Sequence, residues 1–199
     1  MNFLAHIYLS GEDDFIKIGN FIADGIKGKK YKSYPEKIQI GILLHRKIDW
    51  FSDNDDFVKK SKRRLDKRYG HYKGVIIDIF YDHYLAKNWS TYSSIPLQEY
   101  THEFYNLLQN NMDVLPDRIQ FLMKYMIKDD WLTNYANLAG IEKVLIGMNR
   151  RTNKVSDMDL AINDLKANYK DFESDFEVFF DKLRNFSATT LKELKGDFN

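Results

Sequence analysis

The chain has 199 residues, of which 44% are hydrophobic and 15% aromatic, enough for one domain with a sizeable core. Its formal net charge is +1 and it contains no cysteine, so disulfides and thiolate metal sites are excluded and no overall charge attracts nucleic acid or a membrane surface. We see no signal peptide and no apolar run of the ~20 residues that a membrane span needs. We therefore expect a cytoplasmic protein with neither nucleic-acid nor membrane partners.

Helical patterns follow one another along the chain, which has only three prolines and ten glycines. Ser33 with Glu36, and Asp53-Asn54, read as helix start signals, and Gly70 as a break. The predicted helices are residues 13–26, 33–51, 56–69 and 72–89, two that begin near Pro96 and Pro116, and residues 141–148 and 157–183. We find no alternating strand, internal repeat or low-complexity linker. The sequence predicts a single all-α domain, a helical bundle over residues 1–199.

Two of these helices carry ionisable side chains on the face that should be apolar. His45 and Asp49 continue the line of Ile38 and Ile42 at about 100° per residue. Asp78 and Asp82 continue the line of Val75 and Leu85 in the same way. A buried carboxylate is costly unless it is paired or binds a metal ion. Four such positions on two neighbouring helices predict a site.

Two further pairs have the same spacing of four residues: Asn2 with His6, and Asn20 with Asp24. His83 lies at the edge of the Asp82 face and could reach a shared centre. Imidazole and carboxylate donors without thiolate suit Mn²⁺, Mg²⁺ or non-haem iron. The alternative is that these groups form structural ion pairs or hydrogen-bonded core residues.

Several short motifs, in order and spacing, resemble the acyl carrier protein phosphodiesterase family. They are Asn2-Phe3-Leu4-Ala5-His6, Gly19-Asn20 with Asp24, His45-Arg46-Lys47-Ile48-Asp49, Asp53-Asn54, Asp78 through Leu85 and, more loosely, Trp131 through Tyr135 and Val144 through Met148. The resemblance implies a divergent, HD-domain-like helical phosphohydrolase that uses Mn²⁺, with Mg²⁺ or Fe²⁺ as alternatives, to release 4′-phosphopantetheine from holo acyl carrier protein. Common HD enzymes carry a His-Asp doublet, whereas here the adjacent pair is Asp82-His83.

For such a reaction, the expected metal ligands are His45, Asp49, Asp78 and Asp82, with His6 and Asp24 completing the shell or positioning water. His83 would protonate the leaving serine oxygen, because its titration range suits a general acid. Arg46 would hold the phosphate, since a guanidinium can bind two oxygens. Two alternatives are a related phosphohydrolase of nucleotides or other small phosphate esters, and a non-catalytic binding module with a structural ion.

The helix predicted over residues 56–69 has one basic side, which consists of Lys59, Lys60, Arg63, Arg64 and Lys67. Acyl carrier proteins are strongly acidic, so this side could dock one and steer its approach. A second cluster follows Asp24 and consists of Lys27, Lys29, Lys30 and Lys32. The alternative is that the basic helix is only a solvated surface.

Overall fold

The computed structural model describes residues 1–198, and in that part of the chain all regular structure is helical. The α-helices are α1 (Phe3–Tyr8), α2 (Asp14–Ile22), α3 (Glu36–Asn54), α4 (Asp56–Arg64), α5 (Lys73–Lys87), α6 (Leu97–Gln109), α7 (Asp117–Lys128), α8 (Trp131–Asn134), α9 (Leu138–Arg151), α10 (Ala161–Ala167) and α11 (Tyr169–Asp197). Some of the connections contain 3₁₀ segments: η1 (Ala23–Gly25), η2 (Gly28–Ser33), η3 (Lys67–Tyr72), η4 (Trp89–Thr91), η5 (Met112–Val114) and η6 (Met158–Leu160). The all-α prediction is confirmed. Among these helices, none combines the length and apolarity required to cross a membrane.

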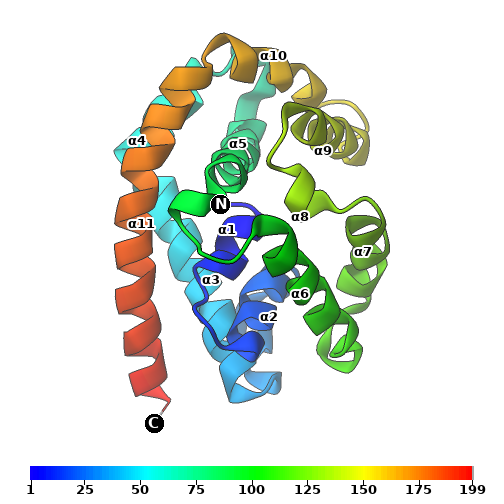
Figure 1. The fold of residues 1–199 in the computed structure, drawn as a ribbon, viewed down its shortest axis with the longest axis vertical. Helices are drawn as coiled ribbons and strands as arrows, with labels where there is room; N and C mark the ends of the chain where they lie inside the picture. Colours follow the sequence, from blue (N-terminus) through cyan, green and yellow to red (C-terminus); the bar gives the residue numbers. More distant parts are fainter. Residues whose placement is uncertain (199) are drawn as a thin grey trace.

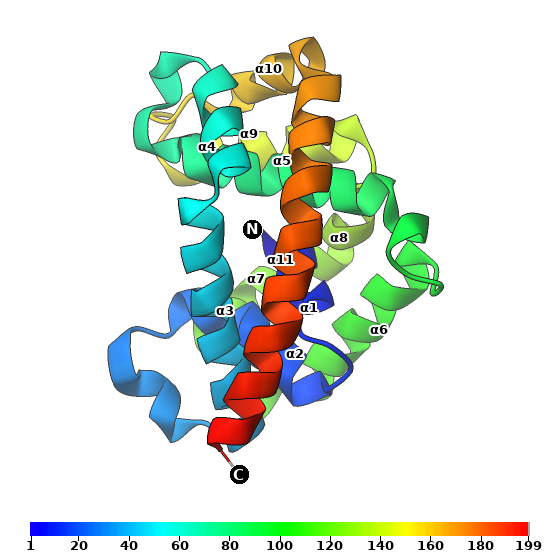
Figure 2. The same ribbon diagram turned by 90° about the vertical axis from the view of Figure 1, so that its left-hand side faces the viewer.

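The longest helix, α11, runs the length of the molecule and contacts α3, α4 and α5 (Figure 1). Figure 2 shows α3 and α11 side by side, with α5 crossing them at one end. Helices α6 to α9 curve around the opposite side in Figure 1, so the short α1 lies in the middle of the molecule. This arrangement surrounds α1 with helices that come from both halves of the sequence.

Helices α2 and α3 make the most extensive contact between two elements, because two glycines let their backbones touch. A Cβ atom on Gly19 would collide with the backbone carbonyl of Ile38, and one on Gly41 with the carbonyl of Ile16. Only glycine therefore fits at either position. The contact brings Asn20, next to Gly19, to within hydrogen-bonding distance of His45, one helical turn after Gly41.

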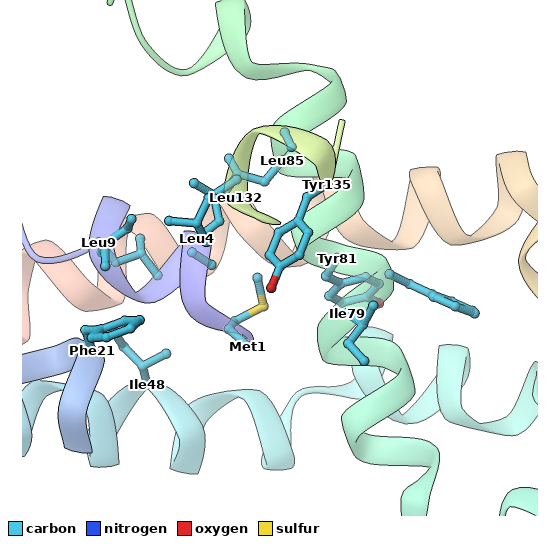
Figure 3. Close-up of a cluster of buried hydrophobic side chains, with 14 of the residues drawn as sticks. Met1, Leu4, Leu9, Phe21, Ile48, Ile79, Tyr81, Leu85, Leu132 and Tyr135 are labelled. Carbon is cyan, nitrogen blue, oxygen red and sulfur yellow. The ribbon is translucent and has the colours of Figure 1, made fainter. Parts of the chain in front are cut away.

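The buried apolar residues of α1 to α11 form one contiguous core. Figure 3 shows its centre, where Leu4 of α1 lies beside Leu85 of α5 and Leu132 of α8. Because α1 begins inside this core, water cannot satisfy its first backbone N–H groups, which need protein partners. The carboxylate of Asp82 is this partner: it accepts hydrogen bonds from the N–H groups of Leu4 at 2.7 Å and Ala5 at 3.2 Å.

Some predicted helix boundaries were wrong. Ser33 does not cap α3: its hydroxyl donates to the carbonyl of Lys30, and Pro35 occupies the N-cap position instead. The helix predicted over 56–69 ends at Arg64, and its start is capped by Asp55. The predicted helix 157–183 is broken at Asn168, whose non-helical backbone separates α10 from α11. Helical periodicity continues across such a break because the same apolar face is buried on both sides.

Candidate active site

Three side chains that could hold a metal ion meet between α1 and α3. His6, His45 and Asp49 each offer a nitrogen or oxygen atom, and these atoms all lie within 4.8 Å of one another. The two imidazole rings stack with their centroids 3.9 Å apart. Nε2 of His45 lies 3.0 Å from Oδ2 of Asp49, and Nε2 of His6 lies 3.3 Å from Oδ1 of the same carboxylate. We call these three residues the His–His–Asp cluster.

Asn20 fixes the orientation of both rings. Its Oδ1 atom lies 2.8 Å from Nδ1 of His6 and 3.2 Å from Nδ1 of His45, and its backbone oxygen lies 2.8 Å from the same His45 nitrogen. The amide nitrogen of Asn20 is occupied elsewhere, because it donates to the carbonyl of His6 and to the hydroxyl of Ser10, both at 2.9 Å. Each Nδ1 atom must therefore carry a proton and donate it to an Asn20 oxygen. The Nε2 atoms are left to face Asp49.

Nε2 of His6 is surrounded by acceptors. It lies 3.1 Å from the carbonyl oxygen of Met1 as well as 3.3 Å from Asp49. Burial, and then the neighbouring His45, lower the pKa of His6 to about 4, so the ring is neutral at pH 7. With its proton on Nδ1, the neutral ring points a lone pair at two oxygens. The lone pair of Nε2 and the two oxygens repel one another, and a cation placed between them would attract all three.

His45 has the opposite electrostatics. Burial alone would lower its pKa, but hydrogen bonds to Asp24 and Asp49 raise it to about 9. Burial would likewise raise the pKa of Asp49, yet the adjacent imidazoles of His45 and His6 hold it well below its usual range. In the metal-free protein the cluster therefore carries a proton on Nε2 of His45. A divalent cation would displace that proton and take its place beside Asp49.

Two further carboxylates lie at the edge of the cluster. Oδ1 of Asp24, in η1, lies 3.2 Å from Nε2 of His45, and 74% of the Asp24 side chain is exposed. Oδ1 of Asp78, in α5, lies 3.1 Å from the amino group of Met1, which is also 4.0 Å from Asp49. Burial raises the pKa of Asp78, against the effect of that amino group. Both carboxylates line the same cleft as His45 and Asp49.

The cleft has a volume of about 870 Å³, within the range of small-molecule sites. Residues of α7, α8 and α9 form another part of its lining. Besides Ile119, four α7 residues spaced as one helical face line it: Arg118, Phe121, Leu122 and Tyr125. Trp131, Met148 and Arg151 complete what we call the α7–α9 wall. Phe121 is 61% exposed and Tyr125 48% exposed, so this wall offers apolar surface to whatever enters the cleft.

The structure places Asp82 and His83 outside the His–His–Asp cluster. Both oxygens of Asp82 accept backbone N–H groups of α1, because the buried start of that helix needs them. The His83 ring faces the other side of α5: Nδ1 lies 2.7 Å from the carbonyl of Tyr135, and Nε2 lies 2.6 Å from the hydroxyl of Tyr169. Neither residue lines the cleft.

Arg46 is also directed away from the cluster. Its Nη2 atom donates to the carbonyls of Ile26 at 2.8 Å and Gly28 at 2.9 Å, and its guanidinium lies over the ring of Tyr31. The structure thus uses this arginine to hold the chain around η2, and Arg46 does not line the cleft.

The basic side of α4 is partly occupied by structural contacts. Lys60 and Arg64 both bind the carboxylate of Asp175 in α11, and this carboxylate is 1% exposed. Ser61 donates to it as well, at 3.0 Å. Lys59 lies 3.7 Å from Asp56. Arg63 and Lys67 are exposed, but no residue of the predicted docking set lines the cleft.

Sequence reasoning paired Asn20 with Asp24 but missed its role as the residue that orients both histidines. It also missed the α7–α9 wall. The i, i+3, i+4, i+7 spacing of Arg118, Phe121, Leu122 and Tyr125 is visible in the sequence. On its own, that pattern indicates an ordinary buried helix face, and only the structure shows it facing a cleft.

Imidazole and carboxylate donors converge in a cleft of this helical protein, and metal-dependent hydrolases use donors of this kind. The family model for acyl carrier protein phosphodiesterase matches residues 1–183, and the chain belongs to this family of enzymes. The resemblance drawn from the short motifs is confirmed.

Similar proteins agree with this assignment. An acyl carrier protein phosphodiesterase of Pectobacterium atrosepticum is 31% identical over 95% of this chain and 98% of its own length. The relative from Photorhabdus laumondii is 31% identical over 90% of this chain and 91% of its own length. An acyl carrier protein phosphodiesterase from Escherichia coli is 30% identical over 92% of this chain and 95% of its own length. No solved structure matches the chain.

Proposed function

We propose that this protein hydrolyses the phosphodiester that joins 4′-phosphopantetheine to a serine of holo acyl carrier protein, and that it requires a divalent metal ion at the His–His–Asp cluster. The observation that carries the metal requirement is the surroundings of His6. Its Nε2 lone pair faces the oxygens of Met1 and Asp49 while Asn20 holds its Nδ1 proton. Family membership supports the substrate.

The donor set suits Mn²⁺, Mg²⁺ or Fe²⁺, since it combines two imidazole nitrogens with carboxylate oxygens and lacks thiolate. The family resemblance favours Mn²⁺ among the three. His6, His45 and Asp49 would hold the ion, and Asp24 and Asp78 stand at the edge as further ligands. When bound, such an ion polarises a phosphoryl oxygen and activates water.

Asp24 is the carboxylate best placed to act on water, because it is exposed to the cleft and adjoins His45. As a base it would orient a water molecule and take its proton during attack on phosphorus. Arg118 and Arg151 carry the positive charge of the α7–α9 wall, and a guanidinium there would bind the non-bridging phosphate oxygens. They replace Arg46 in that role.

The apolar part of the α7–α9 wall fits the pantetheine arm, which combines amide groups with a dimethyl-substituted carbon. Phe121, Leu122 and Tyr125 expose apolar surface to the cleft, where a long flexible chain could lie against them.

The test is to incubate the protein with holo carrier protein and Mn²⁺ and to weigh the products. We expect apo carrier protein and free 4′-phosphopantetheine, and no reaction after treatment with a chelator until Mn²⁺ is restored. Full activity after exhaustive chelation would remove the metal from the proposal. Intact holo carrier protein together with turnover of small phosphate esters would favour the alternative substrate class.

A further inference from the structure

A group of unpaired positive charges follows the candidate active site in the chain. Lys27, Lys29, Lys30 and Lys32 lie in or just before η2 and are all exposed. Among the described residues, none of the four makes an ion pair. Figure 2 shows this blue segment projecting from the body of the molecule beside α3. We call residues 27–32 the lysine segment.

The lysine segment is fastened to the helix that carries the His–His–Asp cluster. Arg46, the residue after His45, donates to the carbonyls of Ile26 at 2.8 Å and Gly28 at 2.9 Å. Its guanidinium also lies 5.2 Å from the ring centroid of Tyr31. Arg46 therefore holds the segment at its start and at Tyr31, which places its backbone in a defined position relative to α3 and hence to His45 and Asp49.

The segment also adjoins the cleft. Asp24 and Gly25 line the cleft, and Lys27 follows two residues later. With consecutive Cα atoms 3.8 Å apart, the Cα of Lys27 lies within about 11 Å of that of Asp24. A protein that contacts these lysines can therefore place a phosphodiester at the cleft without losing contact.

The basic side of α4 lacks these properties. Lys60 and Arg64 are bound to the buried Asp175, so using them to dock a partner would break contacts that hold α4 to α11. None of the α4 cations lines the cleft, and Lys62, which reaches the cleft residue Asp53 at 3.0 Å, is neutralised by that carboxylate. Two positive regions that look equivalent in the sequence therefore differ in how much of their charge remains available.

We propose that the lysine segment is the docking surface for the acidic carrier protein and that Arg46 is the residue that positions it. This inference rests on the proposed function. Charge complementarity identifies the partner: four unneutralised ammonium groups within six residues attract an acidic protein surface and raise its rate of encounter. The lysine segment would then bind the carrier protein, while the cleft recognises the phosphodiester.

The experiment compares two double charge reversals with the same change in net charge. Lys29→Glu with Lys30→Glu alters the lysine segment, and Arg63→Glu with Lys67→Glu alters exposed cations of α4 and its following turn. At low salt we expect the first variant to raise both the Kd and the KM for holo carrier protein by about tenfold or more and to flatten their salt dependence. The second variant should behave as wild type, and kcat should change little in either.

Two controls separate docking from chemistry. Hydrolysis of a small phosphodiester should be the same in wild type and both variants, since that substrate does not touch the lysine segment. Arg46→Ala should raise the KM for carrier protein while leaving kcat and small-substrate hydrolysis nearly unchanged, as a positioning role requires. Loss of kcat on both substrates would instead mark Arg46 as part of the catalytic machinery.

Equal Kd values for the two double variants, or a larger effect at α4, would overturn the docking proposal. Because the Kd reports binding and not turnover, the docking proposal and the proposed hydrolysis can be refuted independently of each other. Carrier protein that binds through the lysine segment but is released intact would refute the proposed hydrolysis and leave the docking surface standing.

Discussion

Helices α3 and α5 carry the same pattern in sequence, two ionisable residues four apart on an apolar face, but the structure uses the two pairs differently. His45 and Asp49 of α3 stay together and face the cleft, 3.0 Å apart. Asp78 and Asp82 of α5 separate: Asp78 lines the cleft, whereas Asp82 caps the buried start of α1. The same spacing thus yields a complete pair of donors on one helix and a single cleft-facing carboxylate on the other.

The difference comes from the neighbouring elements. Opposite α3 lies Asn20, which leaves the imidazole Nε2 atoms free for a ligand. Opposite α5 lies the N-terminus of α1, whose unpaired N–H groups attract the nearest carboxylate. Helical spacing predicts that a charge is buried, and the partner that faces it determines what the charge does.

The largest expected effect tests the central comparison. Asp49→Asn removes the negative charge of the carboxylate that both imidazoles face. A bound metal ion contributes several kcal/mol to such a reaction, so we expect turnover of holo carrier protein to fall by about 10³-fold. Asp82→Asn is the matched change on α5. Its amide oxygen can still accept one of the two α1 N–H groups, so the variant loses some stability but should keep metal and most activity. Measuring the turnover and metal content of the two purified variants shows which carboxylate binds the metal. Equal loss in both would mean that Asp82 is a ligand, as its sequence pattern suggested.

A smaller effect is expected from the residue that orients the histidines. Asn20→Ala leaves both Nδ1–H groups without their side-chain acceptor, and such changes around a metal ligand typically cost about 10- to 100-fold in affinity or activity. Ser10→Ala serves as the control, because Ser10 contacts the amide nitrogen of Asn20 but neither imidazole. Metal titration of the two variants measures the effect. If Asn20→Ala bound metal as tightly as Ser10→Ala, the orienting role would be excluded.

His83 should matter for stability and little for turnover. Its ring lies between the carbonyl of Tyr135 and the hydroxyl of Tyr169, and burial lowers its pKa. His83→Ala removes both hydrogen bonds and leaves the Tyr135 carbonyl without this partner, which costs about 1–3 kcal/mol in the free energy of unfolding. A general acid would instead lose about 10²- to 10⁴-fold in turnover on the natural diester, and much less with a nitrophenolate leaving group. Urea unfolding and kinetics on both substrates distinguish the two roles.

The smallest expected effect concerns Asp82, which should change how the stability of the fold depends on pH and hardly affect activity. Burial raises its pKa to about 7, although the N–H groups of Leu4 and Ala5 act in the opposite direction. In the unfolded chain an aspartate titrates near pH ~4, so the folded protein holds an extra proton between about pH 4 and pH 7. This group's contribution to stability therefore falls as the pH rises through that window.

Asp82→Asn should remove that part of the pH dependence. Unfolding of chelator-treated wild type and variant at several pH values between 4.5 and 7.5 gives the comparison, and their difference in stability should shift in favour of the variant as the pH rises. A constant difference across the window would show that Asp82 is ionised throughout.

Much of the fold and part of the site can be predicted from the sequence, because both depend on local patterns. Pro96 and Pro116 mark the starts of α6 and α7 correctly, and the pairing of His45 with Asp49 follows from spacing within one helix. The spacing of four residues between Asn2 and His6 singled out His6 in the same way. These features involve residues that are close in sequence.

Contacts between distant segments could not be predicted in this way. Asp82 meets Leu4 across 78 residues, and Arg64 meets Asp175 across 111, so no periodicity records either contact. In both cases a charge that looked available for function satisfies a group buried by tertiary packing. The break at Asn168 escaped prediction for a related reason, since the apolar face of α10 continues into α11.

The contact at Gly19 and Gly41 has a consequence for the order in which the protein folds. These glycines are separated by only 22 positions, so closing the connection between α2 and α3 costs little chain entropy, whereas α11 must be brought back from the far end of the sequence. We expect the α2–α3 pair to assemble early, with substitutions at Gly41 slowing folding and substitutions at Asp175 mainly accelerating unfolding. The hydrogen bond between Asn20 and His45 would then form before the cleft that it serves.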